Sequence, residues 1–157
     1  MYFPAVEVLQ TMGLCLSRSL IDTHYLRPEE RLWRGVLVNA FEDALIKHSD
    51  RKSSLQKGQA HNWFIERNIN FKKVCGWGDL DHDLVHEAYI KAIYDGKIRF
   101  TMRQVMWNKY NSFSRSIQKI KEDKVKRQYK GEIKKFRQKV MLTPTCYVTT
   151  VFISVVA

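Results

Sequence analysis

The fold of this chain is decided by residues 101–140, which read TMRQVMWNKYNSFSRSIQKIKEDKVKRQYKGEIKKFRQKV. Thr101 and Gln104 have the spacing of a capping box, in which two side chains satisfy backbone N–H groups at a helix start. The apolar residues that follow are spaced by four, three, four and three positions: Met106, Tyr110, Phe113, Ile117 and Ile120. This heptad-like stripe predicts a long helix that packs one face on the rest of the molecule.

The stripe changes register after Ile120. A second run with helical spacing consists of Val125, Tyr129, Ile133, Phe136 and Val140. The five-residue step between the two runs rotates the second by about 140° relative to the first. An uninterrupted helix over 102–140 would also extend about 58 Å, which exceeds the width of a domain of this size. We therefore expect a bend or a second helix near Glu122-Asp123, with part of the segment projecting or folding back.

Positive charge is concentrated in the same stretch. The chain has a net charge of +11, and residues 97–139 contain 15 Lys and Arg against three acids. This segment therefore carries +12, and the remainder is near neutral at −1. Such asymmetry is expected of a protein that meets a polyanion, with nucleic acid as the first choice and an anionic membrane as the second. The alternative is a basic face that is merely solvated.

The basic side chains along this stretch are the candidate phosphate contacts. They are Arg103, Lys109, Arg115, Lys119, Lys126, Arg127, Lys130, Lys134, Lys135 and Arg137. Contacts of this kind give salt-sensitive affinity but do not read bases, so the sequence predicts nucleic-acid binding of undetermined strandedness, with DNA favoured over RNA. Aromatic residues are interleaved with the cations, as a stacking surface for single strands requires. Their helical spacing favours a core role for most of them, and the apolar side of the helix could also support self-association.

The rest of the chain also predicts helices. Seven Gly and three Pro among 157 residues are few for an all-β fold or a Gly-rich nucleotide-binding fold. Residues 2–20 favour one helix that is interrupted at Gly13. The polar stretch 49–57 predicts a loop that leads into a helix ending near Asn68. We therefore expect an all-α protein built as a compact helical bundle.

A core helix of about 18 residues is predicted to begin at Pro28. The two glutamates that follow this proline lie in the first turn, where they oppose the positive end of the helix dipole. Two apolar rows run along the helix: Leu32, Val36, Ala40 and Ala44 in one, and Trp33, Leu37, Phe41 and Leu45 in the other. Together they predict one broad buried face.

A short helix at 71–75, a Gly-containing turn and a helix over 84–93 form a helix-turn-helix candidate. Asp79 or Asp81 would cap the second helix. This second helix is acidic, which is the wrong sign for reading a DNA groove, so the pair is more consistent with core architecture.

The last 18 residues, 140–157, carry no charge. Pro144 and the β-branched run at 148–153 favour an extended strand or loop packed on the body, while a membrane anchor and an aggregation-prone loose end stay open. The expected organisation is a helical core domain at 1–121, a basic helical extension at 122–139, and this short uncharged tail.

Motifs for catalysis are missing from the sequence. The chain contains no P-loop, dinucleotide fingerprint, nucleophile elbow or zinc-protease string, so we expect no enzymatic activity and no cofactor. Cys75, His82 and His86, with His61 nearby, could form a small zinc site, but such sets arise readily by chance and no metal is expected. Three cysteines without paired spacing indicate a reducing compartment and a cytoplasmic protein.

One stretch of the chain resembles a known pattern. It reads Leu32-Trp33-x-x-Val36-Leu37-x-x-Ala40-x-x-Asp43, then Trp63-Phe64, Phe71-x-x-Val74-Cys75 and Asp81-x-x-x-Val85. This pattern, over residues 32–85, is similar to one in small uncharacterised proteins of tailed phages and prophages. The resemblance implies a phage or prophage setting and a compact helical domain, but no activity. Because such small basic proteins often regulate transcription or handle DNA, it adds DNA binding and transcription regulation as expectations.

The sequence thus predicts a nucleic-acid-binding accessory or regulatory protein that contacts phosphates through a basic C-terminal helix. Two alternatives stay open. The first is a protein-interaction module that docks this helix on an acidic host partner. The second, which is disfavoured, is a peripheral membrane protein that uses the helix together with the uncharged tail.

Overall fold

The all-α prediction is confirmed. The computed structural model describes residues 4–21 and 24–148, and over these ranges the secondary structure consists of eight α-helices without a named strand. None of the helices in the described ranges is long and apolar enough to cross a bilayer.

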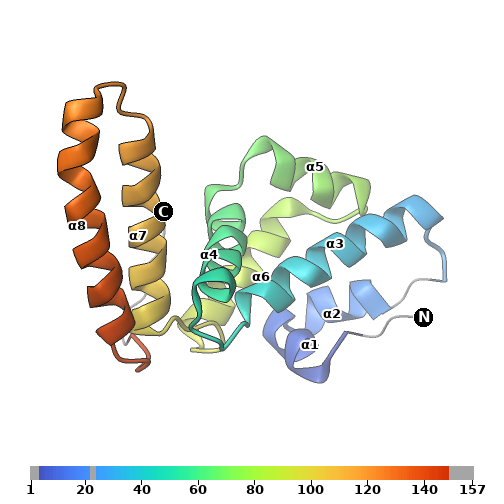
Figure 1. Ribbon diagram of the computed structural model, residues 1–157. Coiled ribbons are helices and arrows are strands. Elements are labelled where there is room, and N and C mark those ends of the chain that lie inside the picture. The colour runs from blue at the N-terminus through green and yellow to red at the C-terminus, as the bar shows by residue number, and fades with distance from the viewer. Residues whose placement is uncertain (1–3, 22–23, 149–157) are drawn as a thin grey trace. The chain divides into compact units, whose positions relative to one another are not determined.

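The chain folds into two units (Figure 1). The core unit comprises residues 1–46 and 59–99, and the hairpin unit comprises residues 47–58 and 100–157. Helix α4 (Arg51–Glu66) is shared between them, since its first half belongs to the hairpin unit and its second half to the core unit. Each unit has its own buried residues.

Five further helices belong to the core unit: α1 (Val6–Met12), α2 (Leu14–Ile21), α3 (Pro28–Ala44), α5 (Ile69–Trp77) and α6 (His82–Tyr94). The predicted interruption at Gly13 is confirmed, because this residue separates α1 from α2 with a φ of 79°, which favours glycine. The predicted cap of α6 is Asp81, whose carboxylate accepts a hydrogen bond from the Asp83 backbone N–H at 2.9 Å. The helix-turn-helix reading of α5 and α6 stays a prediction.

Four aromatic residues form the centre of the core unit. Phe41, Phe64, Phe71 and Tyr89 are each 0% exposed. The rings of Phe64 and Tyr89 are stacked with centroids 4.1 Å apart, and Tyr89 Oη lies 2.8 Å from Nδ1 of the buried His61. These residues come from α3, α4, α5 and α6, so the cluster joins four helices that are separate in sequence.

The first apolar row predicted for α3 is wrong at its N-terminal end. Leu32 and Val36 are exposed, at 64% and 37%. The helix instead buries Arg34, which donates hydrogen bonds to the backbone carbonyls of Gly78 and Asp79 at 2.6 and 3.2 Å. A buried guanidinium is tolerated only where its donors are satisfied, and burial lowers the pKa of this side chain. The buried face of α3 includes this arginine and leaves the N-terminal half of the first apolar row outside. The residues of this face are Arg34, Leu37, Val38, Phe41 and Ala44.

Residues 49–57 do not form the loop that their polar composition predicted. The Asp50 carboxylate accepts a hydrogen bond at 3.0 Å from the backbone N–H three residues later, and α4 begins immediately after this cap. Ser54 and Lys57 are only 0% and 2% exposed. The prediction failed because the buried side of this half-helix is polar, which removes the apolar periodicity that marks a helix.

The hairpin unit is built around α7 (Met102–Gln118) and α8 (Asp123–Leu142), which lie side by side and antiparallel (Figure 1). The predicted capping box at the start of α7 is present, and the predicted break is a turn between two helices. Their shared core consists of Trp107, Tyr110 and Val140 with Met106, Ile133 and Phe136 packed against it. The boundary expected at residue 121 therefore falls between two helices of a single unit.

The predicted uncharged tail is divided in the structure. Its first residues complete α8, and the chain then runs back past the start of α7. Cys146 O accepts a hydrogen bond from Met102 N at 2.8 Å, and Val148 N donates to Phe100 O at 2.9 Å. Residues 149–157, which include most of the β-branched run, lie outside the described residues.

Candidate functional site

Charge is divided unequally between the two units. The hairpin unit has 17 Lys and Arg against four acids, a net charge of +13, whereas the core unit has 10 against 12, a net charge of −2. The separation is sharper than the sequence indicated, because residues 47–58 add four cations and one acid to the hairpin unit. The hairpin unit is therefore the candidate surface for a polyanion.

Packing of α8 on α7 determines where the α8 cations point. The ring of Phe136 lies 5.8 Å from that of Tyr110 and 5.9 Å from that of Phe113, so the apolar side of α8 is turned toward α7. Residues three or four positions apart share a helix face. One such face carries what we call the basic row: Lys126, Lys130, Lys134 and Arg137. At about 1.5 Å per residue the row is roughly 16 Å long.

The predicted cations are mostly unpaired. Within the described residues, the side chains of eight of the ten candidates form no hydrogen bond or ion pair: Lys109, Arg115, Lys119, Lys126, Arg127, Lys130, Lys134 and Arg137. Seven of these are exposed and Lys126 is half-buried. Lys135 differs, because its Nζ lies 3.4 Å from the Glu132 carboxylate in an exposed ion pair of small energetic value. The unpaired cations could contact phosphates without first losing an internal partner.

Arg103 is the predicted contact that has a structural role. Its guanidinium donates to Thr143 O at 2.9 Å and to Met141 O at 3.2 Å. These carbonyls lie at the C-terminal end of α8, where backbone acceptors lack helical partners and the helix dipole favours a cation. Arg103 therefore fixes the end of α8 against the start of α7.

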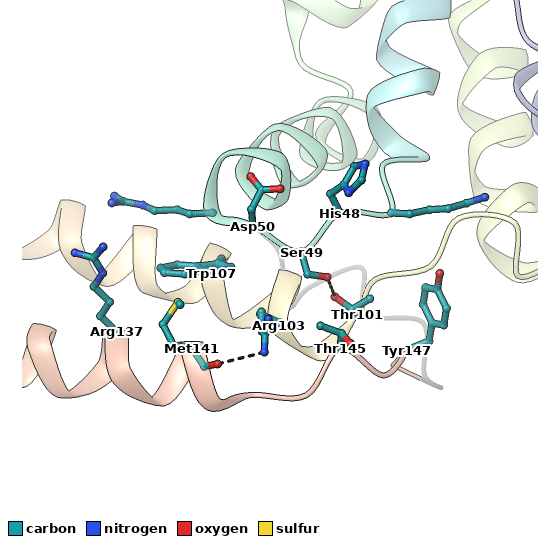
Figure 2. Close-up of a pocket in the computed structure, with 12 residues that line it drawn as sticks. His48, Ser49, Asp50, Thr101, Arg103, Trp107, Arg137, Met141, Thr145 and Tyr147 are labelled. Carbon is teal, nitrogen blue, oxygen red and sulfur yellow. Dashed lines mark hydrogen bonds between the residues drawn. The ribbon is translucent and has the colours of Figure 1, made fainter.

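A pocket of about 710 Å³ lies within the hairpin unit, next to Arg103 (Figure 2). The segment before α4, the start of α7 and the end of α8 all contribute to its walls. Its lining cations are Lys47, Arg51, Arg103 and Arg137, and its lining carboxylate is Asp50. Because Arg137 also belongs to the basic row, the row leads into the pocket.

Hydrogen bonds fix the pocket wall that precedes α4. Ser49 Oγ lies 2.8 Å from Thr101 Oγ1, and Gln104 Nε2 donates to His48 O at 2.9 Å. The guanidinium of Arg51 lies 5.3 Å from the ring centroid of Tyr110, which is a cation–π distance. The pocket is thus formed by side chains held in place rather than by a loose loop.

Sequence reasoning missed two cations, Lys47 and Arg51, that line the pocket. Arg51 belongs to the stretch 49–57, which was expected to be a loop, and Lys47 lies just before that stretch. The second half of α4, α5 and α6 separate both residues from the basic segment in the sequence. The sequence does carry a signal, since residues 47–57 contain four Lys and Arg against one acid. Only the fold brings this signal beside α7 and α8.

The cysteine and histidines considered for zinc do not form a ligand group in the part of the chain that the structure describes. Cys75 is buried, and burial raises the pKa of its thiol to about 11, which disfavours the thiolate that binds metal. His86 Nδ1 lies 2.9 Å from Phe64 O.

A different trio, Asp81, His82 and Asp83, does bring its ligand atoms within 4.8 Å of one another. Both carboxylates are exposed, and Asp83 forms an ion pair with Arg67, whose guanidinium also lies 3.1 Å from His82 Nδ1. This arrangement is explained by the ion pair and the helix cap, so we assign no metal to it.

Comparisons with known proteins do not identify a relative. No protein-family model matches the chain, and no curated protein or solved structure gives a significant match. The resemblance to small phage proteins stays a prediction.

Proposed function

We propose that this protein binds nucleic acid as an accessory or regulatory protein, with the basic row of α8 lying along the phosphates. The observation that carries the proposal is that the four cations of this row lack a hydrogen-bond or ion-pair partner among the described residues. A helix that only needed solubility would mix charges of both signs on its outer face. Here α8 carries eight Lys and Arg against two acids.

The aromatic residues of the hairpin favour phosphate contacts over base stacking on the helices. Trp107 and Tyr110 are 3% and 6% exposed and pack in the α7–α8 core. They are therefore not available as a stacking platform. Phosphate contacts made by flexible lysines position a nucleic acid but do not read its sequence. The proposed binding is accordingly strong at low salt and weakly dependent on sequence.

Charge reversal within the basic row tests the proposal. The variant carries Lys126→Glu, Lys130→Glu and Lys134→Glu. We expect it to lose measurable binding to DNA and RNA at low salt, because each substitution replaces attraction to phosphate by repulsion. Fluorescence anisotropy with labelled oligonucleotides gives the affinity, and circular dichroism checks that the helices are retained.

The matched control reverses three exposed lysines of the core unit, with Lys72→Glu, Lys73→Glu and Lys91→Glu. It lowers the net charge by the same amount, so a loss of binding confined to the row variant locates the site. Equal affinities of the two variants would contradict the proposal, whether both bind or neither does, since only total charge would then matter.

A further inference from the structure

The pocket of the hairpin unit combines properties that a plain phosphate-binding surface does not need. Its volume of about 710 Å³ falls in the range of small-molecule sites. Besides cations, it is lined by the apolar or aromatic side chains of Trp107, Met141 and Tyr147 and by hydroxyl groups. Met141 and Tyr147 are 57% and 44% exposed, so their surfaces are accessible to a ligand. A phosphate ion alone would leave these surfaces uncovered.

The lining charges divide the pocket into functional parts. Arg137 has no hydrogen-bond or ion-pair partner among the described residues and is available to an anion. Arg103 is already bonded to two carbonyls. Asp50 lies between the lining cations Lys47 and Arg51 in the sequence and offsets part of their charge, and its carboxylate can accept a hydrogen bond from an amino group of a base. The pocket thus suits a molecule with one anionic end and one planar polar end.

The basic row indicates how such a molecule arrives. In Figure 2, Arg137 and Tyr147 lie at opposite ends of the pocket, with Met141 and Arg103 between them. Arg137 is also the last cation of the basic row. A nucleic acid strand that follows the basic row therefore reaches the pocket at Arg137. The next nucleotide of this strand is then directed toward Met141 and Tyr147.

From this arrangement we propose that the pocket holds one unpaired nucleotide, with its phosphate at Arg137 and its base against Met141 and Tyr147. This inference rests on the proposed nucleic-acid binding and specifies its substrate as a single strand. A base inside a duplex is stacked and paired, and it enters a pocket only after it is flipped out at an energetic cost. The protein therefore prefers single-stranded nucleic acid to a blunt duplex.

Anisotropy titration tests this preference with a single-stranded DNA oligonucleotide and a blunt duplex of the same length. For the intact chain we expect the affinity for the single strand to exceed the affinity for the duplex by about fivefold or more. Fivefold corresponds to the lower end of the binding free energy that one base gains by packing against a protein surface. A Met141→Ala variant, which removes one of the two side chains proposed to contact the base, should lose most of that preference. Lys130→Gln, outside the pocket, should weaken both and retain the preference.

A second measurement keeps the inference separate from the proposed function. Adenosine monophosphate is titrated into the labelled protein while NMR signals are followed. We expect shifts at the Trp107 indole and the Arg137 side chain in the intact chain and smaller shifts at the same nucleotide concentration in Met141→Ala. Absence of these shifts in the intact chain, or equal affinity for single strand and duplex, would overturn the pocket assignment and leave the row intact. Failure of every oligonucleotide to bind would instead overturn the proposed function.

Discussion

Replacing Lys126, Lys130 and Lys134 by Gln should reduce the salt dependence of binding by a calculable amount. Each lysine that neutralises a phosphate contributes about 0.9 to the slope of log K against log salt for duplex DNA and about 0.7 for a single strand. Loss of three contacts should therefore reduce the magnitude of the slope by about 2.7 for duplex DNA and by about 2.1 for a single strand. Gln is also a good helix former, so α8 should keep its packing on α7.

This reduction is measured against the salt slope of the intact chain. The basic row and the neighbouring Arg127 provide five cations whose side chains are unpaired among the described residues. Five contacts give a slope of about −3.5 on a single strand and about −4.5 on a duplex. Affinity should then fall roughly 100-fold to 500-fold for a fourfold rise in salt.

Anisotropy titrations at several salt concentrations measure the slopes of the intact chain and the Gln variant. A matched variant with Lys72→Gln, Lys73→Gln and Lys91→Gln in the core unit should keep the slope of the intact chain. If the row variant also kept that slope, its three lysines would make no phosphate contact, and the placement of the nucleic acid along α8 would be refuted.

Two further predictions concern stability and reactivity. Gly131→Ala should raise the free energy of unfolding by up to about 1 kcal/mol, because the added Cβ meets open space on an exposed helix. Gly58→Ala should lower the free energy of unfolding by about 1–3 kcal/mol, because the added Cβ displaces the Asn108 side chain from its hydrogen bonds. Chemical denaturation measures both, and a stabilised Gly58→Ala would refute the close packing. Cys75 should resist alkylation at pH 8 while the two exposed cysteines react, because burial raises the pKa of the Cys75 thiol to about 11. Mass spectrometry of the alkylated chain measures the modification at each cysteine. Rapid modification of Cys75 would contradict this prediction.

Local signals in the sequence were sufficient for much of the fold. The capping box at Thr101, the cap at Asp81 and the break at Gly13 each depend on short-range chemistry, and all three are present in the structure. The register change after Ile120 also appears as a real turn between two helices. These features are decided within a few residues of the chain, which is why composition and spacing predict them.

Features that depend on distant partners were not predictable. Arg34 is buried because carbonyls more than 40 residues away accept its hydrogen bonds. The first half of α4 is helical although its buried residues are Ser54 and Lys57. The pocket escaped prediction for the same reason, since it joins the segment before α4 to helices that begin about 50 residues later. The spacing of apolar residues cannot predict which polar side chains are buried, because tertiary contacts decide that burial.

The most direct test of the central claim is an equilibrium titration of the full chain at low salt against labelled single-stranded DNA, single-stranded RNA and duplex DNA. Binding to nucleic acid through the hairpin unit predicts a saturable anisotropy rise that weakens steeply as salt increases and that disappears when Lys126, Lys130 and Lys134 are reversed to Glu. No rise with any of the three nucleic acids, or a rise that survives the charge reversal, would contradict it.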